Sequence, residues 1–256
     1  MISRKLWELS SRILCNPYAY VHQRPYWFGR LHETHIERYM KSNLSKGDTF
    51  IDVGCNCGHH SILGACLVGA EGKVISFEPN KKLVTLLEAH LTIEKLQQIT
   101  LYPIALGTKK STISLYLEDD NCFGSSHISL PERPVLETKN PNLIMECEID
   151  IGDEFIHFNQ LKGKVFLKVD VEGAEIEALS GLKQTLSNYV SHAVVEVTPE
   201  WLGGTEGVNQ LFNLMSDAGL TAYELLPDGK VGSIAKPAEI KKQVDVLFLR
   251  SIPAQF

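Results

Sequence analysis

The feature that most constrains the fold is an alternation of short apolar runs with segments of helical periodicity. Runs that predict strands lie at 49–54, 73–77, 99–106, 165–170 and 193–197. Segments whose apolar residues have helical spacing separate them, at 58–70, 81–96, 173–187 and 205–218. Strands and helices that alternate in this way connect by right-handed crossovers and form a mostly parallel sheet.

Two further runs, at 223–226 and 244–249, complete an α/β, doubly wound sheet of about seven strands, and a Pro/Gly-rich hairpin or loop separates them. Residues 111–118 alternate between apolar and polar side chains, which predicts a strand at the edge of this sheet. The composition of residues 131–142 predicts a loop that makes a surface excursion. No internal repeat divides the chain. The simplest organisation is a helical arm or cap over 1–45 and a ligand-binding domain over 46–256.

The N-terminal arm is rich in aromatic residues and ends in an amphipathic segment, 31–44, which predicts a helix that stops at 45–48. Two interpretations of the arm stay open. It is either a lid that binds an acceptor, or an extension whose aromatic rings pack on the main domain.

Composition excludes several classes of protein. The chain has 256 residues, a net charge of -6 and no basic run, which disfavours nucleic acid as the main partner. No apolar run is long enough for a membrane span, and charged residues interrupt any signal-peptide core at the N-terminus. The six cysteines include no CxxC pair, which is typical of reduced thiols in a cytoplasmic protein.

The first predicted strand ends in a glycine loop, Asp52-Val-Gly-Cys-Asn-Cys-Gly58. Gly54 can adopt a positive φ, and Gly58 lets the chain enter the next helix closely. The spacing differs from the G-x-G-x-x-G of dinucleotide enzymes, which places a pyrophosphate at a helix N-terminus. S-adenosylmethionine has no phosphate; an acid such as Asp52 suits its ammonium, and loop amides suit its carboxylate.

Glu78 closes the second predicted strand, where a carboxylate can accept hydrogen bonds from both hydroxyls of a ribose. Phe77 and Pro79 would line the nucleoside. Simpler interpretations stay open: Asp52 as a helix-capping or loop carboxylate, and Glu78 as a solvated strand-end acid. The predicted residues that bind S-adenosylmethionine are Asp52, Val53, Gly54, Asn56, Gly58, Phe77, Glu78, Pro79 and Ala105.

Three sequence blocks occur in a fixed order: Phe50-Ile-Asp-Val-Gly-Cys-Asn-Cys-Gly58, Phe77-Glu-Pro-Asn80 and Lys168-Val-Asp-Val-Glu-Gly-Ala-Glu175. Over residues 33–200 the chain resembles the FkbM-type S-adenosylmethionine-dependent methyltransferases, and the loop 121–126 is similar to a further family loop. The resemblance implies a class I methyltransferase fold with an antiparallel last strand. It also implies O-methylation of hydroxyls on small molecules or sugars. Cys55 and Cys57 depart from the family's more usual Ala and Ile, without putting cofactor binding in doubt.

Three residues are candidates for catalysis. Asp170, at the end of the fourth predicted strand, is the first choice to orient the acceptor hydroxyl or accept its proton, and Glu172 is the second. Both carboxylates could instead cap the following helix. His59 is a third possible base, although a polar residue of the first helical turn is the simpler interpretation. Lys168 shares a face with Asp170 and could pair with Glu196.

We predict no metal ligands. Cys55, Cys57, His59 and His60 are too crowded within one turn to surround a tetrahedral ion. Asp170 and Glu172 could hold a divalent ion, but no third ligand is identifiable.

The leading functional hypothesis is O-methylation of a small-molecule or carbohydrate hydroxyl with S-adenosylmethionine as cofactor. Two alternatives remain: an NAD-dependent oxidoreductase of the same topology, and a non-enzymatic module that binds a partner through the aromatic arm. Fold alone does not decide among them. An exposed aromatic arm could also support a homodimer.

Overall fold

The computed structural model describes residues 33–117, 126–128 and 144–250, which form two sheets and the helices that cover the larger one. The first described helix is α3 (Thr34–Asn43), which agrees with the helix expected over residues 31–44. The remainder of the predicted arm, the excursion 131–142 and most of the loop 121–126 lie outside the described residues.

The main sheet has the order β11-β10-β12-β9-β8-β1-β2-β3. Five neighbouring strands are parallel: β3 (Ile99–Tyr102), β2 (Lys73–Phe77), β1 (Thr49–Val53), β8 (Val165–Val169) and β9 (Val190–Val197). β12 (Val244–Arg250) inserts antiparallel between β9 and β10 (Leu220–Leu225). The antiparallel last strand that the family resemblance implies is therefore present.

One edge of the main sheet differs from the prediction. β11 (Val231–Ile234) pairs antiparallel with β10, so the described sheet has eight strands rather than seven. This short edge strand lies in the segment that was predicted as a hairpin or loop. Val231 and Ile234 are exposed, so β11 lacks the apolar pattern by which a buried strand is recognised in a sequence.

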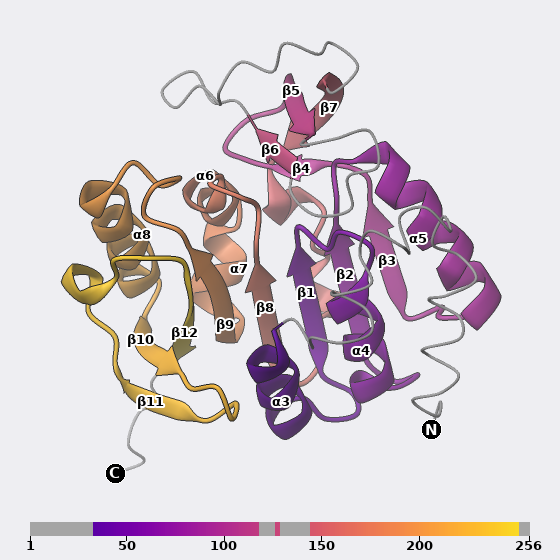
Figure 1. The fold of residues 1–256 in the computed structure, drawn as a ribbon. Coiled ribbons are helices and arrows are strands. Elements are labelled where there is room, and N and C mark those ends of the chain that lie inside the picture. The colour runs from indigo at the N-terminus through magenta and orange to yellow at the C-terminus, as the bar shows by residue number, and fades with distance from the viewer. Residues whose placement is uncertain (1–32, 118–125, 129–143, 251–256) are drawn as a thin grey trace.

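Each face of the main sheet is covered by its own helices (Figure 1). Alternation along β1 sends Phe50 towards α3, α4 (His59–Val68) and α5 (Lys81–Glu94), and sends Ile51 towards α6 (Glu175–Ser180), α7 (Lys183–Asn188) and α8 (Thr205–Asp217). The predicted helix 173–187 is thus two short helices, because the chain turns at Gly181 and Leu182. Short 3₁₀ turns occupy Gly152–Glu154, Phe158–Gln160 and Pro237–Glu239.

A second sheet corrects the predicted role of residues 111–118. These residues form β5 (Ser111–Leu117), which does not extend the main sheet but joins β4 (Ala105–Leu106), β6 (Ser126–Ile128) and β7 (Ile144–Asp150) in the order β4-β7-β5-β6. The predicted strand 99–106 is accordingly divided between β3 and β4. In Figure 1 the small sheet lies beyond the arrowheads of β1 and β2.

Among the described residues, no helix has the length and apolar character needed to cross a membrane.

Candidate active site

Three parallel strands end side by side and place their following loops together. In the register of the sheet, Val53 at the end of β1 pairs with Phe77 of β2 and with Val169 of β8. The loops that follow these residues meet below the small sheet. Ligands of doubly wound sheets bind beyond the carboxyl ends of the strands, so this junction is the expected position of a site.

The first loop can approach the third only because residue 54 is glycine. Gly54 has φ 78°, and a Cβ at this position would lie 1.9 Å from the backbone oxygen of Asp170. The Asp170 amide in turn donates to the carbonyl oxygen of Val53 at 3.0 Å. A larger residue would have to push the two strand ends apart.

The Glu78 carboxylate connects the first two loops. One oxygen accepts a hydrogen bond from the Asn56 amide and the other from the Asn80 amide, both at 2.8 Å. Burial raises the pKa of Glu78 to about 7, although these two amides oppose the shift. Each oxygen keeps a second lone pair, so the carboxylate can still accept hydrogen bonds from a ligand.

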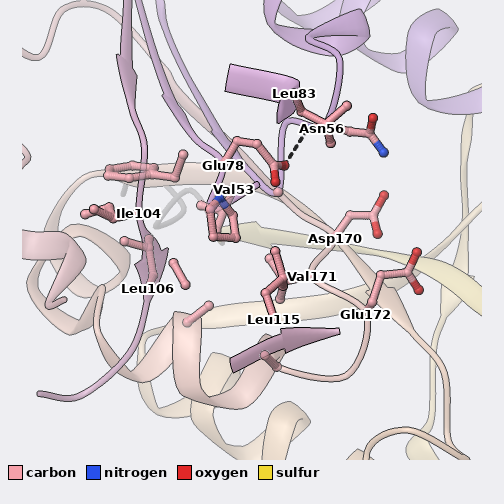
Figure 2. Close-up of a pocket in the computed structure, with 16 residues that line it drawn as sticks. Val53, Asn56, Glu78, Leu83, Ile104, Leu106, Leu115, Asp170, Val171 and Glu172 are labelled. Carbon is pink, nitrogen blue, oxygen red and sulfur yellow. Dashed lines mark hydrogen bonds between the residues drawn. The ribbon is translucent and has the colours of Figure 1, made fainter. Parts of the chain in front are cut away.

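These loops line a pocket with about 680 Å³ of empty space, part of it open to solvent. Figure 2 shows that it is polarised: Ile104 and Leu106 lie at one end, the carboxylates of Asp170 and Glu172 at the other, and Glu78 between them. An apolar cavity with a few directed polar groups is the usual form of a small-molecule site. Its lining residues are Val53, Gly54, Asn56, Phe77, Glu78, Pro79, Leu83, Ile104, Ala105, Leu106, Leu115, Asp170, Val171, Glu172, Ala174 and Ala178.

At the acidic end, Lys168 holds Asp170. The Lys168 ammonium lies 2.8 Å from Oδ2 of Asp170 and is almost fully buried. Burial alone would lower the pKa of Lys168, but the carboxylates of Asp170, Glu33 and Asp52 outweigh it and hold this pKa well above its ordinary value. The sequence allows Glu196 as a partner of Lys168; the ion pair in the structure is instead with Asp170, and Glu196 accepts a hydrogen bond from the side-chain amide of Gln243.

Glu175 is a residue whose task the sequence did not reveal. Its Oε1 accepts hydrogen bonds from the amides of Gly173 at 3.0 Å and Val171 at 3.3 Å, so the side chain turns back and fixes the loop that carries Glu172. Burial raises the pKa of Glu175 to about 7. Glu172 has φ 54°, a conformation that costs free energy outside glycine and that the surrounding hydrogen bonds maintain.

Three of the predicted site residues are not among those that line the pocket. Asp52 is buried below the loop, where its Oδ2 accepts from the Ser61 hydroxyl at 2.6 Å. Gly58, with φ 85°, makes room for Leu87 of α5, which a Cβ would meet at 2.4 Å. His59 lies 3.0 Å from Oε1 of Glu37 on α3.

The pocket also includes apolar residues that sequence analysis did not assign to it. Leu115 comes from β5, whose alternation was recognised but whose position above the strand ends was not. Leu83 follows from the periodicity of α5, yet nothing in that periodicity distinguishes a pocket wall from core. Val171, Ala174 and Ala178 belong to the loop and helix after β8, where the carboxylates were the only chemical signal.

Comparisons with known proteins agree with this architecture. Residues 52–220 match the sequence model of a family described as the methyltransferase FkbM domain. Hexuronic acid methyltransferase AglP of Haloferax volcanii is 26% identical over 175 residues, which are 64% of this chain and 62% of that protein. The chain therefore spans less than two thirds of the length of the curated relative it matches.

Among solved structures, methyltransferase FkbM from Methylobacillus flagellatus KT superposes with a TM-score of 0.50 at 16% identity. The match covers 81% of this chain and 44% of that one. At this identity the likeness concerns the fold, and the fold agrees with the strand order described above.

Proposed function

The chain belongs to the FkbM methyltransferase domain family, and from this premise we propose that it transfers a methyl group from S-adenosylmethionine to a hydroxyl of a small molecule or carbohydrate. The observation that carries the proposal is the polarised pocket. One end suits a nucleoside, and the other presents carboxylates to a reacting hydroxyl.

The nucleoside end favours S-adenosylmethionine over a dinucleotide. Phe77, Ile104 and Leu106 offer apolar surface to a base, and Glu78 is placed to accept hydrogen bonds from the ribose hydroxyls. The loop after β1 has the spacing D-x-G-x-x-x-G, which differs from the G-x-G-x-x-G that cradles a pyrophosphate. Asp52 and Gly58 support this loop from below. In the proposal they shape the cofactor site, and Asp52 can reach the cofactor's ammonium only through water or a local shift.

Asp170 is the proposed catalytic carboxylate. Methyl transfer forms an oxygen–carbon bond as the carbon–sulfur bond of the sulfonium breaks, and the hydroxyl proton must leave. A carboxylate that aligns the hydroxyl and receives this proton accelerates such a step by roughly 10²–10⁴-fold. The Lys168 ammonium fixes Asp170 at the pocket wall, and the loop that Glu175 organises places Glu172 beside it as a second acid.

A sugar acceptor is the favoured class within this proposal. AglP is named for methylation of a hexuronic acid, and the acidic end of the pocket offers several hydrogen-bond acceptors to a polyhydroxylated molecule. The relative's name gives methylation of a hexuronic acid, and the proposal extends methylation of a sugar to this chain without fixing which sugar is used.

The decisive experiment is a calorimetric titration of the purified protein with S-adenosylhomocysteine, with NADH in a parallel cell. We expect micromolar binding of S-adenosylhomocysteine alone, followed by transfer of a labelled methyl group to hydroxylated acceptors. Binding of NADH alone would overturn the interpretation of the glycine loop. Binding of neither by a folded sample would favour a non-enzymatic module.

A further inference from the structure

Three carboxylates from distant parts of the chain converge beside the acidic end of the pocket. Glu33 lies at the start of α3, Asp170 follows β8, and Glu196 lies on β9. One carboxylate oxygen of each lies within 4.8 Å of the others. Among the described residues, no other group of three His, Cys, Asp or Glu side chains has a spacing suited to one ion.

Proximity of acids alone does not make a site, and a second observation at Glu196 points to a ligand. Glu196 is only 7% exposed, and the Gln243 amide donates to its Oε1. Its Oε2 is buried without a hydrogen-bond partner in the described part of the chain. A buried carboxylate oxygen without a partner is unfavourable unless a cation, a donor or its own proton satisfies it.

Basic side chains contact Asp170 and Glu33. The Lys168 ammonium lies 2.8 Å from Oδ2 of Asp170. His60 adds a weaker contact, with Nε2 at 3.6 Å from Oε2 of Glu33. Burial, together with repulsion from the carboxylates of Asp170 and Glu172, raises the pKa of Glu196 to about 9, so a bound cation would replace its proton.

We propose that Glu33, Asp170 and Glu196 bind one divalent cation of the Mg²⁺, Mn²⁺ or Ca²⁺ class next to the methyl-transfer position. All three donors are carboxylate oxygens, the ligands that hard cations prefer. The three oxygens lie within 4.8 Å of one another, so small side-chain movements would bring them to the metal–oxygen distance of about 2.3–2.6 Å that Ca²⁺ requires. Slight closure of the same side chains would suit the smaller ions.

The site has a chemical use that rests on the proposed function. Three protein oxygens leave coordination positions for water and for hydroxyl oxygens of the acceptor. A bound cation would orient the acceptor hydroxyl and favour loss of its proton. One oxygen of Asp170 would bind the cation, and Oδ2, which accepts a hydrogen bond from the Lys168 ammonium, keeps a second lone pair for the hydroxyl proton. The cation would also neutralise repulsion between this acidic wall and an acceptor that carries a carboxylate.

The test measures metal binding alone, without cofactor or acceptor. Full-length protein is titrated with Mn²⁺ and the free ion is followed by electron paramagnetic resonance, with Mg²⁺ and Ca²⁺ as competitors. We expect one saturable site whose affinity falls at least about tenfold in Glu196→Gln and in Glu33→Gln. Glu88→Gln, on the exposed face of α5, is the matched control and should bind as the wild type does.

Glu33→Gln preserves a readout if Glu196→Gln does not fold, because Glu33 precedes α3 and is not part of a sheet. Absence of saturable binding in the wild type would overturn the proposal, and so would equal binding by wild type and Glu33→Gln. S-adenosylhomocysteine binding without metal binding would refute the cation site alone. Metal binding without S-adenosylhomocysteine binding would refute the proposed cofactor while the cation site remained.

Discussion

The two ends of the pocket are built in different ways. The nucleoside end draws its polar contacts from two neighbouring stretches, 53–58 and 77–80, which follow adjacent strands. At the acidic end, Asp170 is joined from outside the pocket by Glu33 and Glu196, which come from segments far apart along the chain. Short motifs therefore specify the first end, and packing of the whole domain specifies the second.

The carboxylates of the two regions also differ in the hydrogen bonds that they accept. Both oxygens of Glu78 accept from backbone amides, so the carboxylate is fixed before any ligand arrives. Glu196 retains a buried oxygen without a hydrogen-bond partner among the described residues. Pre-organisation at the first end suits a constant cofactor.

Gly54→Ala should produce the largest effect, because it breaks the junction on which both ends depend. The new methyl group would overlap the Asp170 carbonyl in a residue of positive φ. We expect a loss of about 4–5 kcal/mol in the free energy of unfolding, measured by chemical denaturation. Gly47→Ala, with a similar φ of 86° and no atom within 4 Å of the new Cβ, should lose only about 1–2 kcal/mol. Equal losses would show that contact between the strand ends is unimportant.

Asp170→Asn should separate the two ends by function. Removal of the charged proton acceptor should lower turnover by roughly 10²–10⁴-fold, while affinity for S-adenosylhomocysteine stays within about threefold of the wild type. Single-turnover methyl transfer and calorimetry would provide the two values. If cofactor affinity collapses in a folded variant, Asp170 belongs to the nucleoside end and the proposed division of roles is wrong.

The same contrast explains what could be predicted from the sequence. The glycine loop and Glu78 were predictable because each follows a strand directly, and parallel strands end at one edge. Their geometry is local, so a short segment contains the needed information. The pairing of Lys168 with Asp170 rather than Glu196 depends on the choice of rotamer, although all three lie on one face of the sheet.

The features that the sequence does not predict depend on long-range packing. The alternation of residues 111–118 indicates a strand but not which sheet it joins, and hence Leu115 was not expected in the pocket. Edge strand β11 lacks the apolar pattern of the buried strands. Glu33 carries no motif, and its approach to Asp170 follows from the docking of Ile36 and Met40 against the main sheet.

Glu78→Gln should weaken the nucleoside end specifically. The side-chain amide of Gln removes the charge, and its NH₂ group faces the backbone NH of Asn56 or Asn80. We expect a loss of about 1.5–3 kcal/mol in binding free energy, or roughly 10- to 150-fold in cofactor affinity. Calorimetry with S-adenosylhomocysteine measures it, and Glu71→Gln on the surface is the control. An unchanged affinity would mean that the ribose lies elsewhere.

The pKa of Glu78, about 7, predicts a pH dependence with a defined sign. Because the folded-state pKa is raised above its ordinary value, the protonated acid favours folding, and this contribution is lost as the pH rises from about 4.5 to 7. Cofactor affinity should change the opposite way: the ribose needs the carboxylate, so affinity should rise by up to about tenfold between pH 6 and 8. Subtracting the Glu78→Gln profile isolates this group from Glu175.

His59→Gln should have the smallest effect, and it tests whether the acidic end extends to this residue. His59 lies against Glu37 of α3 and not on the pocket wall, so we propose that it anchors α3. Stability should fall by at most about 1 kcal/mol, and turnover should stay within about threefold. Thermal unfolding and methyl-transfer rates give the two values. A hundredfold loss of turnover with unchanged stability would instead make His59 the base. The acidic end of the pocket would then include the first turn of α4.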